Sequence, residues 1–515
     1  MSLNRFAIAS LIVGVQGCVG LPSVPGVDAL SSATGVNSLI APGSASSAPQ
    51  AGSQGQSQAQ DDVKVEGIES DVPAILSEVA SGKSYPVEDI LEDDIDGGDA
   101  ALARSERGRI AQIEGNSKGS VPEFEAAVVK IKEFEDRATV SASDVGSHAA
   151  ALVVNDTMIP YEPAGFERVF VYHFQALNYL MQGNLEGAGV EVRRANAEQE
   201  RALKEHADEV AEAEKEAQSK GFKVSDLSDG VLKALGGSAA VGAQVKNSFQ
   251  NAYTFYMSGV VHELNGEPND AYIDYKKALE IYPDNSSVQR DVARLAAALS
   301  MTDDIARFKK RYSAAFAVPV TTDASKTDVV VLFEDGLVPG KSAFWFPLPI
   351  PIPSAPGLTA VAIPTFKTSV NPVHPLTIST STAVLGKTER ICATDALAVK
   401  AYEESAPAMI ARQIVRAAIK GTASAMASKY GGVAGGLAVA AYNTLTEVAD
   451  TRSWRSLPEN AQVLRIAAEP GSTLDLVHDG TGAKGSVALP AGADKRVVVR
   501  AIRIGSTLFV QNAVF

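Results

Sequence analysis

The sequence predicts an α+β protein in which a helical part is followed by a mixed part that contains an antiparallel β domain. Helical patterns dominate from about residue 72 to residue 316. After residue 321 the apolar run Asp328–Phe333 reads as a buried strand, and short strand patterns separated by turn residues continue from Gln462 to the end of the chain. Helices and strands that are segregated in this way are typical of α+β architecture.

The first 17 residues have the pattern of a secretory signal peptide. Arg5 precedes an apolar run from Phe6 to Val15, which is too short to span a bilayer, and Gly17 precedes Cys18. A cysteine at this place predicts lipoprotein processing, with residues 1–17 removed and Cys18 acylated as the membrane anchor. The alternative is an ordinary signal peptide with a chance cysteine. We favour the lipid anchor.

The segment that follows is expected to be a disordered tether over residues 18–70. Residues 19–60 consist mainly of Ser, Ala, Gly, Pro and Gln, a composition that buries too little apolar surface to fold. The net charge of the chain is −15, and residues 61–99 carry −11 of it. Because no basic face is implied, we expect no nucleic acid among its ligands.

Residues 71–318 are predicted to form an α-solenoid similar to tetratricopeptide repeats, which are helix–turn–helix units of about 34 residues. Gly266 takes the turn position of one copy, and Pro283 ends its second helix. Weaker copies place Gly183 and Gly115 at the equivalent turns. The other matching residues are Phe255, Gly259, His262, Ala271, Tyr275 and Ala278, then Tyr172, Ala176, Tyr179, Ala188 and Ala195, then Gly108, Phe124 and Ala127. The alternative is a generic helical bundle with chance matches.

Residues 319–515 are predicted to form the mixed part. Proline at every second position from Pro347 to Pro353 predicts an extended arm, either a docking strip or an arm that lies over its own domain. Residues 396–449 are expected to form a closely packed helical hairpin. The remaining strands predict a small antiparallel sheet, which the strand near Val330 would complete as a sandwich.

The sequence shows no catalytic, cofactor-binding or metal-binding pattern. Gly480–Gly485 matches G-x-G-x-x-G, but a strand pattern follows it where a dinucleotide site needs a helix, so we interpret it as a hairpin turn. The six histidines are isolated and lack zinc spacing. Cys392 lies in an apolar run and is expected to be a buried small side chain. We therefore predict a protein that is not an enzyme.

Three segments resemble a family of bacterial lipoproteins with tetratricopeptide-like helices, whose activity is not established. They are Ala176–Leu180 with Gly183 and Arg193–Asn196, then Val331–Gly336, and then Ala449–Trp454 leading to Leu457 and Pro458. The resemblance implies an envelope lipoprotein on the periplasmic face of the outer membrane. Val19 after the cysteine agrees with outer-membrane sorting.

The leading functional hypothesis is a noncatalytic envelope scaffold that binds a protein partner. A concave groove lined by Tyr179, Tyr253 and Tyr256 would hold that partner, and assistance of cell-wall synthesis is a narrower version that rests on analogy. Arg452 and Trp454 form either a binding site or a latch between the helical hairpin and the sheet, and we favour the latch. The alternative function is binding or processing of peptidoglycan or glycan, which requires a carboxylate pair in a cleft, for example near Asp475 or Asp479.

Overall fold

A computed structural model describes residues 67–141, 160–219, 238–317, 323–350, 357–366, 368–406, 409, 429–430, 432, 449–492 and 495–515. The signal peptide, Cys18, most of the tether and most of the predicted hairpin 396–449 lie outside these residues. The chain from Lys64 to Phe515 forms one compact unit of helices and sheets, which confirms the α+β prediction. Within the described ranges, no helix is both long enough and apolar enough to cross a membrane.

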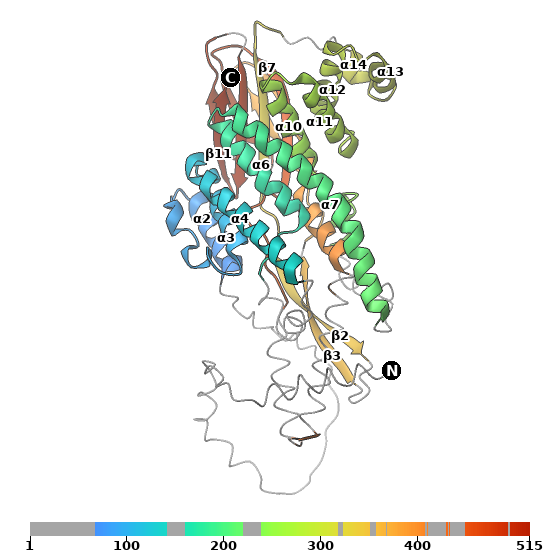
Figure 1. Cartoon of the computed structure of the whole chain (residues 1–515). Coiled ribbons are helices and arrows are strands. Elements are labelled where there is room, and N and C mark those ends of the chain that lie inside the picture. The colour runs from blue at the N-terminus through green and yellow to red at the C-terminus, as the bar shows by residue number, and fades with distance from the viewer. Residues whose placement is uncertain are drawn as a thin grey trace, which may run out of the picture. The chain divides into compact units, whose positions relative to one another are not determined.

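Four helical hairpins follow one another along the described helical part (Figure 1). They are α3 (Ala100–Ile113) with α4 (Ser117–Ser141), α6 (Gly165–Met181) with α7 (Leu185–Ser219), α10 (Ala252–Leu264) with α11 (Pro268–Ile281), and α12 (Ser286–Ala298) with α13 (Thr302–Arg311). Each of these helices packs against the next one in the series. The shorter elements are α2 (Ile68–Ala80), η1 (Val87–Asp89), η2 (Glu92–Asp94), α9 (Ala239–Gly242) and α14 (Ser313–Ala317).

The turns of these hairpins contain a residue in the left-handed region. Gly115, Gly183 and Gly266 have φ angles of 83°, 73° and 75°, which glycine adopts without a steric penalty. The predicted turn positions are therefore confirmed. Ser300 takes the same role between α12 and α13 with φ of 56°, in a hairpin that the glycine pattern of the sequence does not predict.

Local signals explain where the helices of the third and fourth hairpins begin. The side chain of Asn251 accepts hydrogen bonds from the N–H groups of Tyr253 and Thr254, and so caps α10. Asn285 caps α12 in the same way through the N–H of Val288. Pro268 occupies the first position of α11, where its missing N–H leaves no hydrogen bond unmade.

Gly259 allows α10 and α11 to approach closely. A Cβ atom added there would lie 2.5 Å from the ring of Tyr275, which is fully buried. We expect Gly259→Ala to lower the free energy of unfolding by about 1–3 kcal/mol, because the ring must shift. Urea denaturation would measure this. Gly97→Ala is the matched control, since a Cβ there meets nothing within 4 Å, and equal effects of the two substitutions would contradict close packing at Gly259.

The strands form two layers and a separate hairpin. The five-stranded sheet has the order β11-β10-β1-β7-β6, and the four-stranded sheet has the order β5-β4-β8-β9. The bounds are β1 (Thr327–Asp335), β4 (Leu376–Ser379), β5 (Val384–Lys387), β6 (Glu389–Ala393), β7 (Asn460–Ala468), β8 (Thr473–His478), β9 (Lys484–Ala488), β10 (Arg496–Ile504) and β11 (Thr507–Val514).

The prediction of a purely antiparallel sheet is wrong for one pair of strands. β1 and β10 run parallel, with Val330 opposite Val498, whereas the other pairs of the five-stranded sheet are antiparallel. The reason is the route of the chain. It leaves the sheet after β7, passes through β8 and β9 in the second sheet, and returns to the first sheet in the direction of β1.

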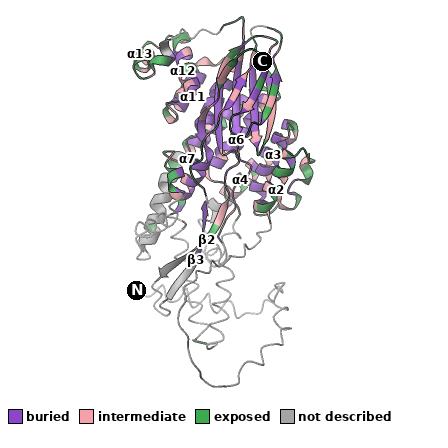
Figure 2. Ribbon diagram, turned by 180° about the vertical axis from the view of Figure 1, so that it is seen from behind, coloured by how far each residue is buried: buried purple, intermediate pink, exposed green. Residues whose placement is uncertain are grey.

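β1 is buried on both faces, which explains its apolar run. Val329, Val331 and Phe333 pack against the four-stranded sheet, as the predicted sandwich requires. Val330 and Leu332 belong to the core that the helices share with the five-stranded sheet. The order of layers is therefore helices, five-stranded sheet, four-stranded sheet, and buried residues line the strands (Figure 2). The predicted parts 71–318 and 319–515 meet across this shared core.

The described part of the proline-rich arm, which ends at Ile350, is a strand. β2 (Lys341–Ile350) pairs in antiparallel register with β3 (Gly357–Phe366), and neither pairs with another described strand. A two-stranded ribbon leaves an outer edge without ladder hydrogen bonds, where proline is tolerated. Figure 1 shows the ribbon extending beyond the sandwich.

Candidate functional site

An irregular stretch of chain, here called the buried segment (residues 449–457), lies between helices and leads into β7. Its N–H groups donate to the carboxylates of three glutamates, Glu69 on α2, Glu106 on α3 and Glu167 on α6. These helices thus form a groove that the chain fills with its own residues. Arg452 and Trp454, two of the residues singled out in the sequence, both lie in this segment.

Four successive main-chain N–H groups of the buried segment are bound by these carboxylates. The N–H of Ser453 donates to Glu69 at 2.5 Å, and the N–H of Trp454 donates to Glu167 at 3.1 Å. The two oxygens of Glu106 accept from the N–H groups of residues 455 and 456, at 2.5 and 3.1 Å. Because main-chain groups make these contacts, they do not depend on the side chains of the segment.

Trp454 anchors the segment in an aromatic pocket. Its ring centroid lies 6.1 Å from that of Phe124 and 5.8 Å from that of Phe174, and its side chain is 2% exposed. The indole N–H donates to Ser456 Oγ at 2.9 Å. Burial agrees with the latch interpretation, and the ring contacts that the structure describes are to α4 and α6. Most of the predicted hairpin 396–449 lies outside the described residues.

Two arginines of the segment lie beside acidic groups. Arg452 donates to Asp450 at 2.7 and 2.8 Å and to Asp99 at 2.5 Å. Arg455 Nη1 lies 3.6 Å from Glu69, and it occupies the space that a side chain at Gly340 would need, since a Cβ there would be 1.6 Å away. The groove therefore combines acidic groups for flanking cations with an aromatic pocket for a central indole.

Burial raises the pKa of Glu69 and of Glu106. It raises the pKa of Glu69 to about 7, although Arg455 and the N–H of Ser453 oppose the shift. Burial likewise raises the pKa of Glu106 to about 8, against the hydrogen bonds from residues 455 and 456. Both groups therefore change charge near neutral pH.

The raised pKa values predict a definite sign for the pH dependence of stability. Glu106 keeps a proton in the folded state up to about pH 8, whereas its ordinary pKa is 4.5. The folded state therefore loses stability as the pH rises between these values, by up to about 1.4 kcal/mol per pH unit. The glutamine of the Glu106→Gln variant cannot ionise. Between pH 5 and pH 8 the free energy of unfolding of this variant should therefore rise relative to that of the wild type. Urea denaturation across this range tests it, and a difference between the two proteins that stays constant from pH 5 to pH 8 would contradict the raised pKa of Glu106.

Next to the groove lies a fully buried charge cluster, with Glu334 of β1 at its centre. Arg109 of α3 forms an ion pair with Glu334, and Arg500 of β10 donates to both of its oxygens, at 2.9 and 3.1 Å. Tyr253 donates to Glu334 at 3.2 Å. Burial alone would raise the pKa of Glu334, but the two guanidinium groups outweigh it and lower the pKa to about 2. Arg109 also donates to Ser456 O at 3.3 Å, which links this cluster to the buried segment.

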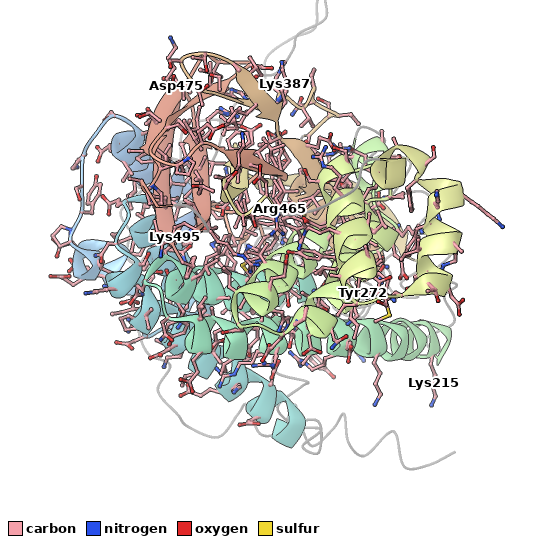
Figure 3. All side chains as sticks on the ribbon, turned by 90° about the horizontal axis from the view of Figure 1, so that it is seen from above. Lys215, Tyr272, Lys387, Arg465, Asp475 and Lys495 are labelled. Atoms are coloured by element: carbon pink, nitrogen blue, oxygen red, sulfur yellow. The ribbon has the colours of Figure 1, made fainter. Side chains whose placement is uncertain are left out.

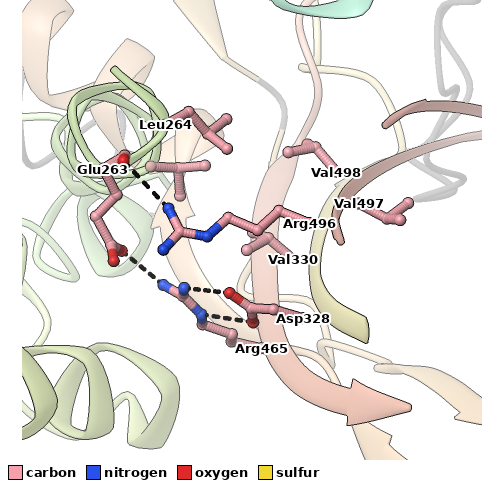
Figure 4. A pocket seen from close by; sticks show the side chains of 9 residues that line it. Glu263, Leu264, Asp328, Val330, Arg465, Arg496, Val497 and Val498 are labelled. Carbon is pink, nitrogen blue, oxygen red and sulfur yellow. Dashed lines mark hydrogen bonds and ion pairs between the residues drawn. The ribbon is translucent and has the colours of Figure 1, made fainter. Parts of the chain in front are cut away.

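A second cluster joins β7 to α10 and α12. Arg465 donates to Glu263 at 2.7 Å, to Asp291 at 3.0 Å and to both oxygens of Asp328. Figure 4 shows Arg465 and Arg496 pointing toward Glu263 across a small hollow. This hollow has a volume of about 10 Å³, which is room for about one water molecule. It is a packing seam and is too small for a larger ligand.

The prediction that three tyrosines line an open groove is wrong for two of them. Tyr253 and Tyr256 are fully buried, because neighbouring helices and the five-stranded sheet surround α10. Tyr253 packs on His173 of α6 and donates to Glu334 of β1, and Tyr256 packs on Tyr275 of α11. Tyr256 donates to Asp291 at 2.9 Å. Tyr179 is only half-buried, and its hydroxyl lies 3.3 Å from Glu125. Of the three tyrosines, only Tyr179 is accessible to a partner in this structure.

The acidic residues proposed for glycan chemistry do not share an enclosed cleft. Asp475 is exposed on β8, and Figure 3 shows it with Lys387 on the far side of the molecule from the helices. Asp479 accepts hydrogen bonds from Lys387 at 2.7 Å and from Thr377 at 2.6 Å. No specific geometry at these residues favours glycosidic chemistry.

Two further expectations are confirmed. Residues 480–485 connect β8 to β9 and begin β9, with φ of 72° at Gly482, so the glycine motif is a hairpin turn. Cys392 is buried, and burial raises the pKa of its thiol to about 12, which makes it a poor nucleophile.

His262, Glu267 and Asp270 bring possible metal-ligand atoms within 4.8 Å of one another at the turn between α10 and α11. His262 Nδ1 lies 2.6 Å from Glu267, and Arg193 donates to both oxygens of the same carboxylate at 2.9 and 3.0 Å. A guanidinium that holds the carboxylate on both oxygens competes with a cation for it. The group is better explained as ion pairing between α7 and the α10–α11 turn.

Comparison with protein-family models and with curated proteins finds no match to this chain.

Proposed function

We propose that this protein is a lipid-anchored scaffold of the bacterial outer membrane, facing the periplasm, which binds a protein partner without covalent chemistry. The observation that carries the proposal is the spacing of the helices. α10 and α12 begin at residues 252 and 286, and α11 and α13 begin at residues 268 and 302, so both pairs are offset by 34 residues. That offset equals the period of tetratricopeptide repeats, whose stacked hairpins are protein-binding surfaces.

The other hairpins support the same interpretation. Gly183 and Gly266 hold equivalent turns, and Val190 of α7 and Ile273 of α11 lie seven residues beyond them. Both side chains are exposed, by 41% and 48%, on the second helices of their hairpins. Since the sheet covers the first helices, we place partner contacts on these outward second helices.

Crosslinking in intact cells tests the scaffold. A photoreactive amino acid at Val190 or Ile273 should crosslink to one envelope protein, whereas the same group at Asp475, on the far sheet, should not. Equal crosslinking at all three positions would indicate nonspecific neighbours and contradict a partner surface.

Membrane fractionation tests whether Cys18 carries the lipid anchor. Cys18→Ala should release the protein from the membrane fraction, because the acyl chains would no longer be attached. A variant that still fractionates with membranes would show that Cys18 is not the anchor.

A further inference from the structure

We infer that the groove between α2, α3 and α6 is a recognition site for an irregular peptide segment with a tryptophan flanked by arginines, and that the buried segment (residues 449–457) occupies it as a built-in competitor. The inference rests on the proposed scaffold function and specifies what one of its surfaces binds. The partner is a segment of another protein with the same chemistry, which takes the place of the internal one.

The way in which the segment is held is that of a bound peptide. Glu69, Glu106 and Glu167 accept four consecutive main-chain N–H groups, while one aromatic pocket accepts Trp454. In peptide-binding sites, main-chain hydrogen bonds supply affinity and a few side-chain pockets supply specificity. Tryptophan is also enriched among the residues that contribute most of the binding energy at interfaces, and such residues lie in desolvated pockets.

The segment is attached mainly through side chains of the groove, so its release would not break a sheet or a helix. None of residues 449–457 belongs to a helix or strand. The main-chain partner of Leu457 O is the N–H of Val338, at 2.9 Å, next to the start of β7. Removal of residues 450–456 would therefore leave the sandwich ladder intact.

The internal segment also fits the groove imperfectly. Ser453 Oγ and Arg455 Nε are buried without a hydrogen-bond partner in the described structure. Buried polar atoms of this kind weaken binding. A segment with alanine at the position of Ser453 would lose one of these defects and keep all four main-chain contacts, so an external ligand can exceed the internal one in affinity.

The acidic groups around the groove select the flanking residues. Asp99 and Asp450 hold Arg452, and Glu69 lies beside Arg455. Asp450 belongs to the segment itself, so Asp99 and Glu69 are the groups that the groove offers to an external arginine. Gly340 provides the space for the second guanidinium.

A fluorescent peptide with the sequence of residues 449–458 tests this on the full chain. Trp454→Ala empties the aromatic pocket and weakens the internal segment as a competitor, although its main-chain hydrogen bonds remain possible. The peptide should therefore bind this variant roughly tenfold or more tightly than the wild type. A peptide with alanine in place of tryptophan should not bind, and Glu167→Gln added to Trp454→Ala should weaken binding. If the peptide binds neither protein, or binds both equally, the inference is overturned. It is also overturned if the wild type exchanges the segment between two copies in a dimer.

Hydrogen exchange of the wild type provides a second test in case Trp454→Ala does not fold. The N–H groups of residues 453–456 should exchange through local opening, faster than those of β1. Exchange only at the rate of β1 would show that the segment is a permanent part of the core. These results are independent of the cellular crosslinking. If a partner is crosslinked in cells but the peptide does not bind, only the proposal of a peptide-binding groove is overturned. If the peptide binds but no partner is crosslinked in cells, only the proposed scaffold function is overturned.

Discussion

Glu334→Gln should lower the free energy of unfolding by about 3–5 kcal/mol, because it leaves two buried guanidinium groups without their counter-charge. Arg109 and Arg500 are 1% and 0% exposed, and each already has a buried Nη1 without a hydrogen-bond partner. Neither arginine can move into water without separating α3 from the five-stranded sheet. Urea denaturation followed by circular dichroism measures the loss.

The effect of Glu334→Gln has a characteristic dependence on pH. The folded pKa of Glu334 is about 2, below its ordinary value of 4.5, so its stabilisation is present above pH 4.5 and disappears as the pH falls toward 2. The difference in the free energy of unfolding between the wild type and Glu334→Gln should become smaller over that range. Glu78→Gln is the matched control, because Glu78 pairs with Lys83 at the surface and such pairs contribute about 0–1 kcal/mol. A gap that stays constant in acid would show that the charge of Glu334 is not the cause.

Local patterns in the sequence were sufficient to locate the hairpin turns and the central strand. Gly115, Gly183 and Gly266 are where a left-handed turn requires them, and the apolar run at Val331 is a strand buried on both faces. The hairpin of α12 and α13 was missed because Ser300 replaces the turn glycine. Its 34-residue offset from Gly266 is a signal that could have identified it.

The candidate site could not be assembled from the sequence, because its parts are far apart in the chain. Glu69, Glu106 and Glu167 lie on three helices, and their ligands are main-chain groups of residues 453–456, which leave no mark on composition or spacing. The tyrosines were misassigned for a related reason. Tyr253 and Tyr256 have the spacing of a groove face, but their burial by other helices and by the sheet cannot be inferred from the sequence of α10 alone.

Arg465 links β7 to the third and fourth hairpins, and so contributes to holding the helical layer on the sheet. Its guanidinium is shared by Glu263 of α10, Asp291 of α12 and Asp328 of β1. Arg294 also pairs with Glu263 and Asp291, at 2.7 and 2.9 Å. Two arginines thus balance three carboxylates. Burial would raise the pKa of Glu263, but Arg465 and Arg294 outweigh it and hold that pKa well below its usual range.

Arg465→Met should therefore destabilise the protein by about 3–5 kcal/mol. It removes the guanidinium that binds both oxygens of Asp328, and it takes from Glu263 and Asp291 an ion-pair partner that they share with Arg294. Asp328→Asn added to Arg465→Met should recover part of the loss, because it removes one uncompensated charge, and a double-mutant cycle measures the coupling. Arg307→Met is the matched control, as Arg307 pairs with Asp304 at the surface. In wild type the contribution of Glu263 is lost as the pH falls below about 4.5, so the difference between wild type and Arg465→Met should shrink in acid. Equal losses for Arg465→Met and Arg307→Met would mean that apolar packing alone holds the helices to the sheet.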